Sequence, residues 1–101
     1  MVAGKLTVVI DSEAKRSLRE AYEYIQKDSL QNAEKVRAAI LSSFEELIIY
    51  PEKHAPDKYR IDKNSAYRAY EIYKYRISYH ISATEIRIIR IRHTKMNPLP
   101  H

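Results

Sequence analysis

A chain of 101 residues with 45% hydrophobic residues is long enough for one modest core, so we expect residues 1–101 to form a single domain. The absence of cysteine excludes disulfides, thiolate catalysis and cysteine-ligated metals, and no apolar run approaches the roughly 18–20 residues that span a membrane. The net charge is +5, which excludes a strongly acidic protein and favours acidic partners.

The first segment predicts a short strand followed by a helix. Residues 5–10 (KLTVVI) are rich in β-branched side chains and favour a buried strand. The N-terminus lacks the length and cleavage site of a signal peptide, so we expect a cytoplasmic protein without a membrane partner. Asp11 or Ser12 then offers an N-cap to a helix that ends near residues 27–28. One apolar stripe at helical spacing supports this helix: Ala14, Leu18, Ala21, Tyr22 and Ile25.

A second helix follows almost at once. Asp28 or Ser29 provides its N-cap, and Pro51 stops it. Its apolar stripe again has helical spacing: Ala33, Val36, Ile40, Phe44 and Leu47. A connection of about two to four residues is typical of an antiparallel helical hairpin, whose apolar stripes must pack on another element.

The second half predicts a loop and three strands. Residues 51–66 are polar and contain two prolines, which indicates a loop. Residues 67–73, 74–82 and 85–93 favour strands joined by short turns, so an antiparallel meander is the economical arrangement. The expected order is β-α-α-β-β-β. This is an α+β fold in which the helical hairpin packs on one face of a small, mostly antiparallel sheet.

Strict alternation over residues 74–82 assigns side chains to the two faces of this sheet. Tyr75, Ile77, Tyr79 and Ile81 would pack under the helices. The opposite face would then carry Arg76, Ser78, His80 and Ser82, and no further helix exists to cover it.

The last strand does not alternate regularly. One interpretation is a bulge between Ile88 and Ile89, which would place the arginines on one face and the isoleucines on the other. The second interpretation is a strand that is buried on both faces. The position of His93 depends on where this strand ends.

The second half is also the basic half, and it holds six of the nine tyrosines. Residues 51–101 carry eleven Lys/Arg and five Asp/Glu, whereas residues 1–50 carry seven and eight. Cations contact phosphates and planar rings stack on bases, so this half suits a nucleic acid. The alternative is that the charges only keep a sheet soluble.

Three segments together resemble the RelE/ParE superfamily of bacterial type II toxins. They are "SEAKRSL" with "YI" in the first helix, "YRISY" at residues 75–79, and "IRIIRIRHTKMNP" at residues 86–98. The resemblance covers nearly the whole chain and includes the expected order of elements. It implies a toxin that an acidic antitoxin holds inactive by wrapping an extended or helical segment over it.

The superfamily has two unlike activities. Members similar to RelE cut messenger RNA on the ribosome, whereas members similar to ParE poison DNA gyrase. From the sequence we expect a ribosome-dependent, metal-independent endoribonuclease that inhibits translation. The alternatives are a gyrase inhibitor of ParE type, and a family member that only binds an antitoxin or DNA.

The resemblance also implies site residues for RNA cleavage. Arg76 would stabilise the phosphate, because its guanidinium can bind two phosphate oxygens; the alternative is an ion pair with a sheet carboxylate such as Glu71. His93 would be the general acid or base, although members similar to ParE also carry a histidine there, and it could equally be structural.

Five further residues are candidates for substrate binding. Arg92 and Lys95 would hold backbone phosphates, although each could be an ordinary surface cation. His80 lies about 13 Å along the strand from Arg76, too far to share a phosphate, and would at most flank the substrate. His54 would reach the same face from the loop, and Tyr73 would stack on a base or simply pack.

The sequence predicts no cofactor and no metal. The four histidines lack close metal-ligand spacing, and a chain with one glycine has no glycine-rich phosphate loop.

Overall fold

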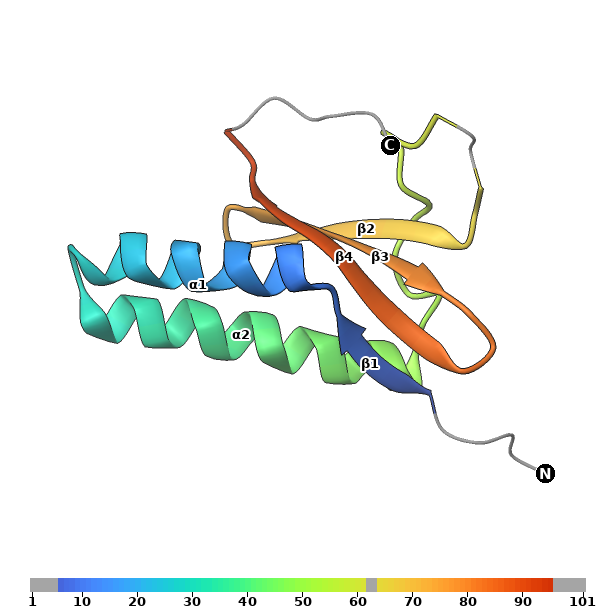
Figure 1. Cartoon of the computed structure of the whole chain (residues 1–101), viewed down its shortest axis with the longest axis horizontal. Coiled ribbons are helices and arrows are strands. Elements are labelled where there is room, and N and C mark those ends of the chain that lie inside the picture. Colours follow the sequence, from blue (N-terminus) through green and yellow to red (C-terminus); the bar gives the residue numbers. More distant parts are fainter. Residues whose placement is uncertain (1–5, 62–63, 96–101) are drawn as a thin grey trace.

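The computed structural model describes residues 6–61 and 64–95 of the chain. The elements follow the expected order β-α-α-β-β-β. Their bounds are β1 Thr7–Ile10, α1 Ser12–Gln26, α2 Leu30–Ile49, β2 Tyr67–Ile72, β3 Tyr75–Ile81 and β4 Glu85–His93. The two helices lie side by side, and the sheet forms the second layer of the molecule (Figure 1).

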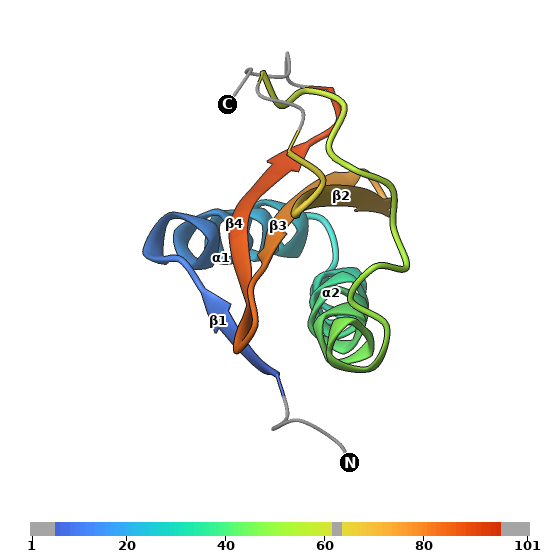
Figure 2. The same cartoon turned by 90° about the vertical axis from the view of Figure 1, so that its right-hand side faces the viewer.

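The four strands form one mixed sheet in the order β1-β4-β3-β2. Strands β2, β3 and β4 are the expected antiparallel meander. Strand β1 pairs in parallel with the start of β4, from Thr7 opposite Glu85 to Ile10 opposite Ile88. The two helices cover one face of this sheet, which we call the helix face; the other is the outer face (Figure 2).

Local contacts set the limits of the helical hairpin. The Ser29 side chain caps α2 by accepting a hydrogen bond from the backbone N–H of Asn32 at 3.0 Å. Asp11 precedes α1, but its side chain does not cap the helix and instead binds Arg87 on β4. The Tyr22 hydroxyl on α1 donates to the Glu34 carboxylate on α2, which joins the two helices on their exposed side.

A β-bulge in β4 resolves the irregular pattern of the last strand. Ser78 lies opposite Arg90 and Tyr79 lies opposite Ile88, so Ile89 is the extra residue. The bulged interpretation is therefore confirmed. Three isoleucines of β4 enter the core, namely Ile86, Ile88 and Ile91, and the strand's arginines belong to the outer face.

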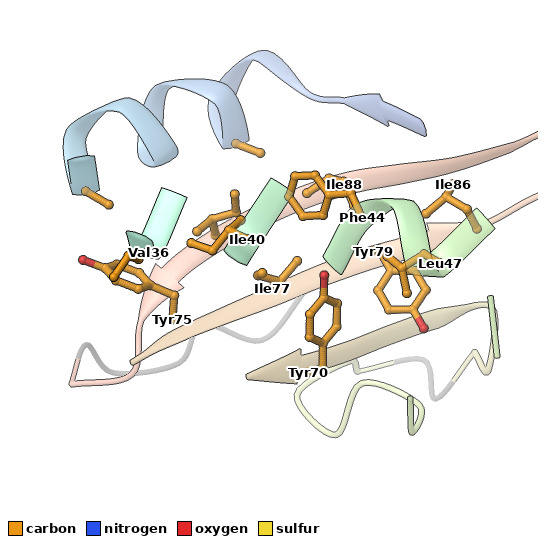
Figure 3. Packing of buried hydrophobic residues seen from close by; sticks show 13 residues of the cluster. Val36, Ile40, Phe44, Leu47, Tyr70, Tyr75, Ile77, Tyr79, Ile86 and Ile88 are labelled. Atoms are coloured by element: carbon orange, nitrogen blue, oxygen red, sulfur yellow. The ribbon is translucent and has the colours of Figure 1, made fainter. Parts of the chain in front are cut away.

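The core lies between the helices and the helix face (Figure 3). The predicted stripe of α2 is buried throughout, as are three residues of the β3 alternation, Tyr75, Ile77 and Tyr79. The Tyr79 ring is fully buried, and its hydroxyl donates to the carbonyl oxygen of Pro51 at 2.7 Å. This bond links the centre of the sheet to the start of the loop after α2.

Residues 55–57 of the loop after α2 make more regular contacts than the composition of the loop predicts. Pro56 forms an isolated antiparallel bridge with Arg68, and the Asp57 N–H donates to the carbonyl oxygen of Tyr67 at 2.8 Å. Residues 55–57 therefore run along the edge of β2 that faces away from β3, as Figure 2 shows. Tyr73 lies in the turn between β2 and β3 with a positive φ of 54°, rather than in the strand predicted for residues 67–73.

We predict that Ile77→Ala lowers the free energy of unfolding by about 3 kcal/mol, because it removes a fully buried side chain from the centre of the core. The matched control is Ile61→Ala, since Ile61 is 74% exposed and should change stability by less than about 0.5 kcal/mol. Urea unfolding followed by circular dichroism measures both. Equal effects of the two substitutions would contradict the assignment of the core.

Candidate functional site

Arg76 projects from β3 onto the outer face, where carboxylates already hold it. Its Nη2 atom donates to Asp57 Oδ1 at 2.8 Å, and Nη1 lies 4.0 Å from Glu71 Oε2. The guanidinium also lies 4.6 Å from the centre of the Tyr59 ring. The Asp57 side chain is fully buried, and only 17% of the Arg76 side chain is exposed. The ion pair between Arg76 and Glu71, which the sequence offered as the alternative to phosphate binding, is therefore present. Asp57 is a second, closer partner of Arg76, and the sequence did not indicate it.

This arrangement limits what Arg76 can bind. Glu71 lies directly opposite Arg76 in the β2–β3 register, whereas Asp57 reaches it from the loop beyond β2. A phosphate would have to compete with the buried carboxylate for the same guanidinium nitrogens. Displacing Asp57 would separate its buried charge from the Arg76 guanidinium, which is strongly unfavourable.

A second aromatic and cationic group lies farther along the outer face. The guanidinium of Arg60 lies 3.3 Å from the centre of the Tyr67 ring, and that ring packs against His80 at 4.5 Å. Tyr67 and His80 are direct partners across the β2–β3 ladder. His80 is therefore on the predicted face, but it packs against a tyrosine, well away from Arg76.

His93 lies on the helix face instead. It is opposite Tyr75 in the β3–β4 register, and the two rings meet edge-on at 5.2 Å. Its Nδ1 atom accepts a hydrogen bond from the backbone N–H of Lys95 at 3.0 Å. Because Tyr75 and Arg76 are adjacent in β3, their side chains leave the sheet on opposite faces. The structure therefore does not bring His93 and Arg76 together.

The remaining cations of β4 differ in their surroundings. Arg92 pairs with Arg76 across the β3–β4 ladder, so both belong to the outer face. Arg87 binds Asp11 at 2.7 Å and Glu85 at 2.9 Å, and these carboxylates raise its pKa. Lys95 is exposed just beyond the end of β4, on the side of His93.

His54 packs on the helix face near the end of α2, so it does not join Arg76. Its ring stacks on Tyr70 with 4.1 Å between centroids and 13° between planes. Its carbonyl oxygen accepts from Arg68 at 2.6 Å, and the Tyr70 hydroxyl shares a hydrogen bond with Ser43 on α2. Burial lowers the pKa of His54 and raises the pKa of Tyr70 to about 12. The loop after α2 begins on the helix face of the sheet, so His54 does not reach the outer face.

The described residues contain no group of three or more His, Asp or Glu side chains that could hold a metal ion. Within the same residues, neither helix is both long and apolar enough to cross a membrane. Tyr73 is exposed in its turn and makes none of the ring contacts described above. Of the predicted site residues, Arg76, Arg92 and His80 share the outer face, whereas His93 and His54 lie on the helix face.

One comparison with known proteins identifies a family. Residues 8–98 match the model of the ParE toxin of type II toxin–antitoxin system, parDE. A solved structure titled "Chromosomal ParDE TA system from P. aeruginosa" superposes with a TM-score of 0.69 and 18% sequence identity. The superposition covers 90% of this chain and 98% of the other, and at this identity it supports the fold alone. No curated protein matches the sequence.

We predict that Arg76→Gln lowers the free energy of unfolding by about 3 kcal/mol, because it removes the Arg76 cation from the buried Asp57 carboxylate. The double variant Arg76→Gln/Asp57→Asn should lose less than the sum of the two single variants. Urea unfolding of all four proteins measures this coupling. Arg16→Ala, an exposed change on α1, is the control and should have little effect. Additive losses would show that the two side chains do not stabilise each other.

We also predict that the stability of the chain falls as the pH drops below about 6.5, the ordinary pKa of histidine. The pKa of His54 is lower in the folded than in the unfolded chain, so the unfolded chain takes up the proton first. His54→Phe keeps a planar ring on Tyr70 and should remove this part of the pH dependence. Unfolding measured from pH 5 to pH 8 tests it, and identical profiles for both proteins would assign the effect to another group.

Proposed function

Because the chain belongs to the ParE toxin family of type II toxin–antitoxin systems, we propose that it is the toxin of such a pair and that it inhibits DNA gyrase. Messenger RNA cleavage, the activity favoured by the sequence, becomes the second candidate. The family match supports this order, since it is to ParE toxins over nearly the whole chain.

The observation that carries the proposal is the separation of Arg76 from His93. Metal-independent RNA cleavage requires a base, an acid and a cation around one phosphate. Arg76 lies on the outer face in an ion pair with Asp57, whereas the His93 ring packs against Tyr75 on the helix face. His80 shares the outer face but is about 13 Å away along the strand. These side chains do not form a common site.

One observation favours the second candidate. Arg92 lies beside Arg76 on the outer face, and a stack of Arg60, Tyr67 and His80 lies farther along it. Cations next to aromatic rings are typical of surfaces that bind single-stranded nucleic acid. This face could hold RNA even though the acid and base for cleavage are not assembled on it.

The charge distribution supports an acidic antitoxin as the partner of this chain. The +6 charge of residues 51–101 favours rapid association with a protein of opposite charge. Ribosome and messenger RNA are partners only in the second candidate, whereas gyrase is the target in the first.

We predict that the purified chain inhibits the supercoiling of relaxed plasmid by gyrase and leaves messenger RNA intact in a cell-free translation reaction. Gel electrophoresis of the plasmid and primer extension on the message measure the two activities. The matched variant is Arg76→Gln/Asp57→Asn, which removes both charges of the pair. This variant should inhibit gyrase as strongly as the original chain.

The opposite result is equally clear. New cuts in the message that require ribosomes, and that disappear in the double variant while supercoiling continues, would establish the second candidate. A chain with neither effect would be a family member that only binds its partner.

A further inference from the structure

Three cations gather in a pocket between the two helices, which we call the hairpin pocket. Its volume is about 440 Å³. Lys15 and Arg19 line it from α1 and Arg37 lines it from α2, together with the half-buried Leu18 and Tyr22. All three cations are exposed, and among the described residues none of them forms an ion pair. The hairpin pocket therefore presents three unpaired positive charges to solvent.

This gathering does not reflect a general excess of positive charge on the helices. Together α1 and α2 contain five Lys/Arg and six Glu, yet no glutamate lines the hairpin pocket. Glu13 and Glu20 line the groove between α1 and β4 instead, and Glu34 accepts the hydrogen bond of Tyr22. Positive and negative side chains are thus separated on the surface of the hairpin, as a site for an anion requires.

Tyr22 helps to position the cation of the second helix. Its hydroxyl donates to Glu34 on α2, and the guanidinium of Arg37 lies 5.9 Å from the centre of its ring. The hydrogen bond to Glu34 raises the pKa of Tyr22, so the phenol stays neutral and adds no negative charge. Arg37 therefore reaches the hairpin pocket from α2, across from the two cations of α1.

The two cations of α1 repel each other. Lys15 and Arg19 are four residues apart, so they lie on the same side of the helix, roughly 6 Å apart along its axis. Like charges at this spacing destabilise a helix, and a bound anion would relieve the repulsion. Arg19 and Arg37 carry guanidinium groups, whose planar geometry matches two oxygens of one phosphate.

The lining of the hairpin pocket favours duplex DNA among the possible polyanions. The one ring in the pocket, Tyr22, already packs with Arg37, so no ring is free to stack on an unpaired base. An acidic protein segment would need apolar surface to bury, whereas Leu18 and Tyr22 are already half-buried within the hairpin. The duplex backbone presents closely spaced phosphates that cations alone can bind.

We propose that the hairpin pocket binds the phosphate backbone of duplex DNA through Lys15, Arg19 and Arg37, without reading its base sequence. The inference adds a ligand and a site that gyrase inhibition does not include. In the proposed toxin, the same contact would reach the DNA that gyrase holds.

Binding of duplex DNA by the intact free chain tests the proposal. The probe is a fluorescein-labelled duplex of about 20 base pairs and arbitrary sequence, titrated by fluorescence anisotropy between about 50 and 200 mM salt. Lys15→Gln/Arg19→Gln should weaken binding about tenfold and reduce the slope of log affinity against log salt by about two, because it removes two phosphate contacts.

The matched control is Arg16→Gln/Lys35→Gln, which removes the same charge from exposed positions outside the hairpin pocket. It should change the affinity by less than about threefold. Equal weakening by the two double variants would overturn the inference, because binding would then follow from the net charge of the chain. The absence of duplex binding at the lowest salt would also overturn it.

Two competitors test the choice of duplex DNA. Tighter binding of a single-stranded oligonucleotide than of the duplex would assign the nucleic acid to the rings of the outer face and contradict the proposal. Displacement of the duplex by polyglutamate at an equal concentration of charge would show that the pocket accepts an acidic protein segment equally well. Retention of the duplex against both competitors is the expected result.

Amide chemical shifts of the intact chain locate the contact independently. Unlabelled duplex should shift the amides of residues 15–22 and 37 most, and those of β2 and β3 little. The largest shifts on β2 and β3 would overturn the inference. None of these measurements involves gyrase, so the binding of DNA can be confirmed or lost whatever the supercoiling reaction shows.

Discussion

One extra residue in β4, Ile89, determines how the two faces of this sheet differ. Side chains alternate along a strand, so without the bulge Ile86 and Ile88 would share a face with Arg90 and Arg92. The core would then contain two guanidinium groups, and burying unpaired charges is prohibitively unfavourable. The bulge shifts the register by one residue, so Ile91 faces the core with Ile88, and the arginines face outward. The position of His93 follows from the same shift.

The outer face is less available than a bare sheet would be. Residues 55–60 pass along β2 and place Asp57 and Tyr59 against Arg76, while Arg60 covers Tyr67. Much of the positive charge at Arg76 is therefore balanced within the chain. Arg76 is therefore ion-paired and is not readily available to a phosphate. The exposed side of the helical hairpin, where the hairpin pocket lies, is the other candidate surface.

The hairpin pocket and the outer face have different roles in the proposed toxin. The hairpin pocket presents three exposed cations to the phosphates of DNA. The outer face contributes rings and guanidinium groups that pack on each other and stabilise the sheet. The helical hairpin supports both, because it buries the helix face and carries the hairpin pocket between its two helices.

The sequence by itself determined the elements and their order, because helical and strand periodicities are local. Ser29, Pro51 and the alternation of β3 locate two helix ends and one strand to within a few residues. The sequence also predicted the bulge in the last strand, as one of two interpretations of its irregular pattern. Only the tertiary structure decided which interpretation holds, because the choice depends on how β4 pairs with β3 on either side of Ile89. The same is true of the Asp57–Arg76 pair, which joins residues 19 positions apart, and of His54 and His93, whose neighbours come from other elements. Such contacts depend on how distant segments pack, and no local pattern encodes them.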